Sequence, residues 1–151
     1  MLQATLREQA ILENENILIL TMGLPRSGKS TWARSSACPI VCPDAIRLAI
    51  HGQSFIATAE SFVWATAHAM VAALFIAGHR IIILDACNNI IKRRKEWRSK
   101  QWTTFVKVFT TSREECLARA NTAPNKDDLI RTINRMFEQH EPLQQDEKVW
   151  E

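Results

Sequence analysis

Gly23-Leu-Pro-Arg-Ser-Gly-Lys-Ser30 follows directly after the apolar run 17–22 and carries the strongest structural signal in this chain. The pattern Gly-x-x-x-x-Gly-Lys-Ser is typical of a phosphate-binding loop between a buried strand and a helix. Its glycines let the backbone N–H groups turn inward, and the helix that begins near Lys29 adds the positive end of its dipole. The sequence therefore predicts a site for a nucleoside triphosphate with a divalent metal ion.

The residue types of the loop indicate individual roles. We expect Lys29 to reach the β- and γ-phosphates, the Ser30 hydroxyl to ligate Mg2+, and Thr31 to lie near the α-phosphate. Arg26 either adds a cation at the mouth of the site or points to solvent. The residues expected to contact the triphosphate are Gly23, Leu24, Pro25, Arg26, Ser27, Gly28, Lys29, Ser30 and Thr31.

The size and composition of the chain are those of one globular domain. It has 151 residues, of which 46% are hydrophobic, enough for a sizeable core. A net charge of +3 does not by itself indicate a nucleic-acid partner, although residues 80–107 hold eight basic and only two acidic side chains. Four cysteines without metal-binding spacing, and an amino terminus without a signal-peptide core, favour a cytoplasmic location.

Apolar runs alternate with helical patterns along the chain, which predicts an α/β fold. We expect strands at 17–22, 39–42, 80–85 and 104–110, with helices at 29–36, 44–51, 59–77, 91–100, 112–119 and 127–140. Such alternation favours a parallel sheet of four to five strands with helices on both faces, a three-layer sandwich. Residues 1–16 are interpreted as a loose amino-terminal extension, and 17–151 as a single domain.

One predicted helix resembles a membrane span in length. Residues 58–77 are mostly apolar, but Glu60, Thr66 and His68 interrupt them and a strand-like run follows at once. We therefore expect a helix buried in the core rather than a span, and no association with a membrane. His68 is interpreted as a core or edge histidine.

Cys42-Pro-Asp-Ala-Ile-Arg47 is the second stretch with chemical content. Asp44 follows the second predicted strand, and Arg47 lies one turn later on the same helical face. The carboxylate can accept a proton from an attacking hydroxyl, and the arginine can clamp a phosphate of the acceptor. The alternative is a helix cap beside a surface charge. Because parallel strands end at one edge, Asp44 and Asp85 should meet the phosphate loop there.

Four stretches together carry a resemblance to a known family: residues 23–33, 43–47, 81–88 and 113–119. They resemble the kinase domain of bacteriophage-type 5′-hydroxyl polynucleotide kinases and their small P-loop kinase relatives, over about residues 17–142. The resemblance implies a P-loop kinase-like fold that binds ATP and Mg2+ through Lys29, Ser30 and Thr31.

The resemblance also implies roles on the acceptor side and in a lid. Asp44 would be the general base on the acceptor hydroxyl, and Arg47 would hold the adjacent 3′-phosphate. Asp85 would support the site through metal-bound water or through substrate. Arg119 would begin a short lid, around residues 119–127, that closes over the γ-phosphate.

The chain departs from the family pattern in two places. Ala45 stands where the family often has a second acid, and the lid is shorter, with only Arg119 and Lys126 as cations. A transition-state arginine contributes about 10³–10⁵ in rate. Either Arg119, Arg26 or Arg131 supplies it, or the enzyme is slow, or the substrate differs.

The function expected from the sequence is a kinase that transfers the ATP γ-phosphoryl group to the 5′-hydroxyl of DNA or RNA. One alternative is a kinase of a nucleoside, nucleotide or other small metabolite. The other is an ATP-binding accessory module without activity. The basic run 92–100 either follows a phosphate backbone, with Trp97 or Trp102 as a stacking platform, or is a solvated face with its tryptophan packed inside.

Overall fold

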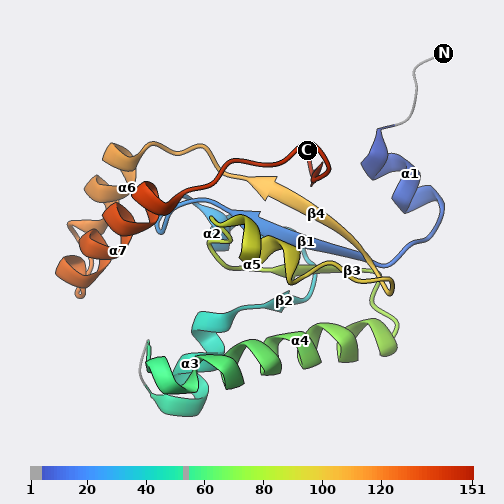
Figure 1. Cartoon of the computed structure of the whole chain (residues 1–151), viewed down its shortest axis with the longest axis horizontal. Coiled ribbons are helices and arrows are strands. Elements are labelled where there is room, and N and C mark those ends of the chain that lie inside the picture. Colours follow the sequence, from blue (N-terminus) through green and yellow to red (C-terminus); the bar gives the residue numbers. More distant parts are fainter. Residues whose placement is uncertain (1–4, 53–54) are drawn as a thin grey trace.

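The computed structural model describes residues 5–52 and 55–151, and its centre is a parallel sheet (Figure 1). The strands are β1 (Ile17–Met22), β2 (Ile40–Val41), β3 (Ile81–Leu84), β4 (Thr103–Val108) and β5 (Lys148–Val149), in the order β2-β3-β1-β4-β5. Every neighbouring pair is parallel. The predicted α/β sheet is confirmed, with β5 as a strand that the sequence pattern does not indicate.

Helices cover both faces of this sheet. They are α1 (Leu6–Leu12), α2 (Lys29–Ser35), α3 (Pro43–His51), α4 (Glu60–Ile76), α5 (Ile91–Lys95), α6 (Arg113–Ala120) and α7 (Lys126–Gln139), with a 3-10 turn, η1 (Ala57–Ala59), before α4. Side chains of β1 alternate between the faces: Leu18 packs with α3 and α4, whereas Ile19 packs with α1 and α2. The predicted three-layer arrangement is confirmed.

The amino-terminal segment is ordered by specific contacts, so the expectation of a loose extension is wrong for the residues described. Thr5 and Glu8 form a capping box at the start of α1. Ala10 is buried in the core, and the guanidinium of Arg7 lies 4.2 Å from the centre of the Trp150 ring. Residues 1–4 of the predicted extension lie outside the described residues.

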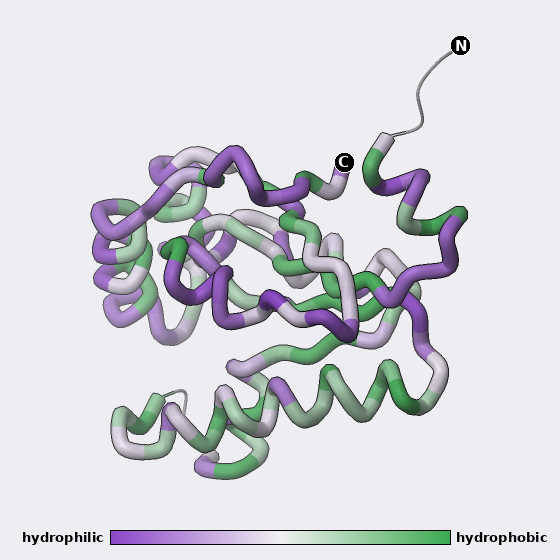
Figure 2. The backbone as a smooth tube through the Cα atoms, turned by 45° about the vertical axis from the view of Figure 1, so that its right-hand side comes forward, coloured by the Kyte–Doolittle hydropathy of each residue, from purple (hydrophilic) through white to green (hydrophobic). Residues whose placement is uncertain are grey.

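Helix α4 is buried on one face only, which corrects the expectation of a helix buried all round. Val63, Ala67 and Val71 are fully buried against the sheet, while Phe62 and Ile76 remain 58% and 88% exposed. Figure 2 shows mostly hydrophobic colouring along this helix, interrupted by short hydrophilic segments. By length and composition, the segment Ala57–Ile76 is the one candidate membrane span among the described residues, a test that core helices also pass.

Three neighbouring strands, β2, β3 and β1, have their carboxyl ends at one edge of the sheet. β1 leads into the phosphate loop, β2 into Asp44 on α3, and β3 into Asp85. The Thr21 hydroxyl ties two of these ends together, because it donates to the carbonyls of Leu84 and Ala86. The convergence expected from the strand pattern is therefore present.

Candidate active site

The phosphate loop has the backbone geometry that its glycines require. Gly28, at the N-cap of α2, has a φ of 101°, which is open to glycine at little cost. A Cβ on Gly23 would lie 2.8 Å from Ser27 Oγ and 2.9 Å from Phe109 Cβ, so the loop packs directly against its glycine. Arg26 also has a positive φ, 66°, and its exposed side chain points away from the core.

Lys29 lies inside the loop rather than in solvent. Lys29 is only 7% exposed, and its Nζ donates a hydrogen bond of 2.6 Å to the Leu24 carbonyl. Ser27 Oγ is 3.5 Å away. The ammonium is thus held where the loop turns, the place from which a phosphate-loop lysine reaches the β- and γ-phosphates.

Ser30 and Asp85 form the part of the site that fits a metal ion. Ser30 Oγ donates to Asp85 Oδ2 over 2.7 Å, and Asp85 is almost fully buried. Mg2+ in nucleotide sites is usually held by one or two protein oxygens, substrate phosphates and water, and this pair suits that pattern. The described residues hold no cluster of three or more His, Cys, Asp or Glu side chains that would bind a metal without a phosphate ligand.

Arg119 reaches the phosphate loop from the end of α6. Its Nη1 donates to the Arg26 carbonyl over 3.0 Å, and Nε donates to Glu115 over 3.0 Å. Residues 121–125 connect α6 to α7 and correspond to the middle of the predicted lid. Arg119, the cation expected in the lid, therefore lies beside the phosphate loop.

On the acceptor side, Asp44 and Arg47 form the pair expected from their spacing. Asp44 lies in the first turn of α3 with a side chain 80% exposed, and its Oδ1 accepts from Arg47 Nη1 over 2.6 Å. Glu60, the first residue of α4, binds the other side of the Arg47 guanidinium. Its two oxygens accept from Arg47 Nε and Nη2 over 2.9 and 2.6 Å.

Glu60 is the functional candidate that the sequence reasoning missed. It was seen only as a charge that interrupts an apolar stretch, and nothing in its spacing connects it to Arg47. A carboxylate at the start of an otherwise apolar helix was the available signal. Burial by itself would lower the pKa of Arg47, but its hydrogen bonds to Glu60 and the charge of Asp44 outweigh burial and raise that pKa.

Cys87 follows Asp85 at the end of β3 and contacts the phosphate loop. Burial raises the pKa of its thiol, Lys29 lowers it, and Asp44 and Asp85 raise it. Its backbone carbonyl also accepts from the N–H of Gly23 over 3.1 Å, which links the end of β3 to the phosphate loop.

An aromatic cluster stands behind Arg47. The Trp64 ring centre lies 5.8 Å from the Arg47 guanidinium carbon and 3.9 Å from that of Arg93. Trp97, fully buried, packs edge-on against Trp64 and stacks on His68 at 3.8 Å. Trp97 is thus a core residue, which excludes it as a platform for bases.

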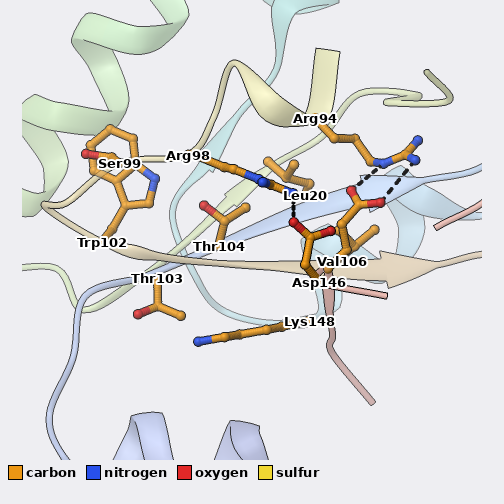
Figure 3. A pocket seen from close by; sticks show the side chains of 11 residues that line it. Leu20, Arg94, Arg98, Ser99, Trp102, Thr103, Thr104, Val106, Asp146 and Lys148 are labelled. Atoms are coloured by element: carbon orange, nitrogen blue, oxygen red, sulfur yellow. Dashed lines mark hydrogen bonds and ion pairs between the residues drawn. The ribbon is translucent and has the colours of Figure 1, made fainter. Parts of the chain in front are cut away.

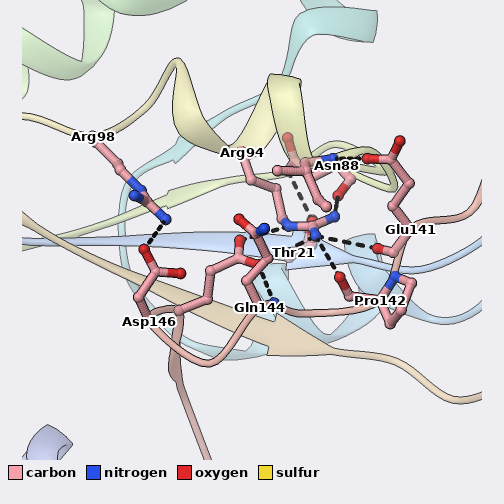
Figure 4. A network of polar contacts seen from close by, with 10 residues as sticks. Thr21, Asn88, Arg94, Arg98, Glu141, Pro142, Gln144 and Asp146 are labelled. Carbon is pink, nitrogen blue, oxygen red and sulfur yellow. Dashed lines mark hydrogen bonds and ion pairs between the residues drawn. The ribbon is translucent and has the colours of Figure 1, made fainter.

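The basic run also serves the fold. Arg94 is buried, pairs with Glu147, and donates to the carbonyls of Asn88, Glu141 and Pro142, as Figure 4 shows. It thereby fastens the carboxyl-terminal segment to the strand end that carries Asp85. The predicted helix 91–100 is shorter than expected, because α5 ends at Lys95.

A pocket of about 320 Å³ lies beside β4, between α5 and the carboxyl-terminal segment (Figure 3). Arg98 and Asp146 pair across it over 3.0 Å, and Trp102 and Lys148 also line it. Trp102 stacks on Phe75 of α4 and is partly buried. None of the residues predicted for the active site lines this pocket.

The structure brings some of the predicted site residues into contact with one another and leaves others apart. Lys29, Ser30, Asp85 and Arg119 contact one another or the loop backbone, and Asp44 pairs with Arg47. Leu24 instead packs against the small core between α6 and α7. Thr31 is exposed on α2, and Pro25 is half-buried in the loop.

Comparisons with known proteins give the family and the fold of this chain. The family model described as an AAA domain matches residues 18–143, which is most of the chain. No curated protein matches the sequence. Among solved structures, one described as the Pnkp1/Rnl/Hen1 complex is 28% identical, with a TM-score of 0.62 over 70% of this chain. This chain spans 39% of that one.

Two further structures share the fold. A sugar kinase from Janibacter sp. HTCC2649 is 17% identical, with a TM-score of 0.65, and the match covers 89% of this chain and 83% of the kinase. Kti12 from Chaetomium thermophilum, in complex with ADP-AlF3, is 20% identical, with a TM-score of 0.52 and 88% of each chain covered. The chain therefore belongs to the AAA domain family, and its fold and motifs are those of the small P-loop kinases.

Proposed function

We propose that this protein transfers the γ-phosphoryl group of ATP to the 5′-hydroxyl of DNA or RNA. The observation that supports this most is the Asp44–Arg47 pair, held at 2.6 Å on the same sheet edge as the Ser30–Asp85 pair. A base and a phosphate clamp beside a phosphate loop are the parts that a polynucleotide acceptor requires. The resemblance of residues 23–33, 43–47, 81–88 and 113–119 to 5′-hydroxyl polynucleotide kinases also favours a 5′-hydroxyl acceptor.

The residues divide the reaction between them. Lys29 and the loop N–H groups bind the β- and γ-phosphates, and Arg119 approaches the transferred group from the lid. Asp44 takes the proton of the acceptor hydroxyl while the hydroxyl oxygen forms the new bond to the γ-phosphorus. The bond from that phosphorus to the β–γ bridging oxygen breaks, and ADP leaves. Mg2+, held by Ser30 and Asp85, would neutralise charge that develops on the β- and γ-oxygens.

The test is transfer of label from γ-labelled ATP to an oligonucleotide with a 5′-hydroxyl. We expect labelled product from the wild-type protein and from Lys148→Ala, an exposed lysine on β5 outside the predicted site, and none from Lys29→Ala. ATP binding without any labelled oligonucleotide would contradict the proposal. If none of the hydroxyl compounds became labelled, the result would favour an accessory module that binds ATP without transferring its phosphate.

A small neutral acceptor is the second candidate, and one observation favours it. Glu60 already occupies two donors of Arg47, so the clamp is engaged before an acceptor phosphate arrives. Salt separates the two candidates, because an oligonucleotide that neutralises several cations loses affinity steeply as salt rises. A KM for the acceptor that stays constant between low and high salt would point to a nucleoside or another small metabolite.

A further inference from the structure

Arg47 is bound on both sides by carboxylates of its own chain. A guanidinium has five N–H donors, and three of those of Arg47 are used by Glu60 and Asp44. Its side chain is only 12% exposed, with Trp64 behind it. An acceptor phosphate that binds Nε and Nη2 of Arg47 at two points must therefore displace Glu60.

The charge of this cluster opposes an incoming phosphate. Two carboxylates face one guanidinium, so Asp44, Arg47 and Glu60 together carry one net negative charge. Glu60 is bound in the two-point manner by which arginine also binds phosphate. In the described residues both of its carboxylate oxygens bond to Arg47 alone, so its side chain can leave without breaking another contact.

We propose that Glu60 is a specificity-determining residue that competes with the acceptor's phosphate for Arg47. The inference rests on the proposed function and adds a residue to it. An acceptor with a phosphate beside its reacting hydroxyl exchanges one two-point anion for another, so the contact that Glu60 gives up reduces what the acceptor gains from Arg47. An acceptor without that phosphate leaves Glu60 in place and gains nothing from Arg47.

Direct binding tests the competition without requiring catalysis. The probe is adenosine 3′-phosphate, and unmodified adenosine is the comparison, each titrated calorimetrically into the full chain. Glu60→Gln keeps the shape of the side chain but removes its charge, and we expect the Kd for adenosine 3′-phosphate to fall about fivefold, since a partly exposed ion pair contributes roughly 1 kcal/mol. The Kd for adenosine should not change.

Two further variants make the result specific. Glu96→Gln removes the same charge from a nearby Arg93 pair that does not touch Arg47, so it controls for a general change of electrostatic potential. We expect it to leave both Kd values unchanged. In Arg47→Ala, the preference for the phosphorylated probe should disappear, and adding Glu60→Gln should not restore it.

The outcomes separate this inference from the proposed function. A Kd for adenosine 3′-phosphate that is unchanged or weaker in Glu60→Gln, or no binding of the probe by any variant, would overturn the competition. Tighter binding of the probe by a protein that transfers no phosphate to a 5′-hydroxyl would overturn the proposed function alone. Should Glu60→Gln fail to fold, Glu60→Asp, with a shorter reach, should tighten binding by a smaller factor.

Discussion

The donor and acceptor sides of this site are built in different ways. On the donor side, one short loop supplies backbone N–H groups, a lysine held against its own carbonyl, and a serine beside a buried carboxylate. On the acceptor side, three side chains from two helices meet, and two of them neutralise the third. The donor site is thus specified locally, whereas the acceptor site depends on how α3 and α4 pack.

This difference predicts how each side responds to change. A loop held by its backbone should tolerate little alteration of shape, because Gly23 leaves no space for a Cβ and Gly28 has a positive φ. A cluster of side chains should tolerate alterations of shape better, but it should respond to alterations of charge. The predictions below test that contrast, in order of decreasing effect.

Arg119→Ala tests whether the sparse lid supplies the transition-state cation. Since Arg119 contacts the loop carbonyl of Arg26, we expect kcat to fall about 1000-fold or more, with the Kd for ATP changed little. Single-turnover transfer to a 5′-hydroxyl oligonucleotide measures it. Arg131→Ala is the matched control, because that arginine pairs with Asp128 on α7. A larger loss in the control would assign the role to Arg131.

Asp44→Asn tests the base on the acceptor side. The amide keeps the shape of the carboxylate but cannot take the proton, so kcat should fall roughly 100-fold or more. ATP binding should be unchanged, because Asp44 does not touch the phosphate loop in the described residues. A loss below tenfold would mean that Asp44 acts as a helix-terminal charge and not as the base.

Gly23→Ala tests the backbone of the donor side. The added Cβ would lie 2.8–3.1 Å from Ser27 and Phe109, so the loop must shift. We expect the Kd for ATP to rise roughly tenfold, the effect of about 1.4 kcal/mol. Gly78→Ala is the control, since its φ of 99° strains an alanine but its Cβ would meet nothing. Equal effects on ATP binding would show that the loss reflects stability and not loop geometry.

His68→Phe tests a pH-dependent contact behind the acceptor side. Burial lowers the pKa of His68 below its ordinary value of 6.5, Glu96 raises it and Arg93 lowers it. The unfolded chain therefore binds this proton at higher pH than the folded chain, so stability falls as pH drops below 6.5.

His68→Phe keeps the stacking on Trp97 but has no titrating group. Its stability should therefore lack the part of the pH dependence that comes from His68. We expect a difference of about 1–2 °C in the Tm change between pH 7 and pH 5. His79→Phe, at an exposed position, serves as the control. A His68 variant with the wild-type pH dependence would contradict the assignment.

The donor side could be predicted because its signals are local in sequence. The phosphate loop lies in eight consecutive residues, and four of the five strands are apolar runs bounded by turns. The position of Asp85 followed from the rule that parallel strands end at a common edge. Its hydrogen bond to Ser30 confirms the edge but could not be deduced from spacing alone.

The parts that sequence reasoning missed depend on contacts between distant segments. Strand β5 has only two residues and exists because Lys148 and Val149 pair with Phe105 and Val106. The buried role of Arg94 requires a carboxyl-terminal segment that returns to it. Glu60 reaches Arg47 because α3 and α4 pack together, which no periodicity encodes.

The sheet order has a consequence for how the chain is made. β1 is the central strand, all six of its residues are buried, and its partners are β3 and β4. Both partners are synthesised long after it, so the loops that join them must close before β1 gains any pairing. A nascent chain therefore keeps this apolar strand unpaired on the ribosome, where an exposed strand favours aggregation. Slower synthesis past residue 22 would lengthen that interval, and holdase chaperones should matter most during it.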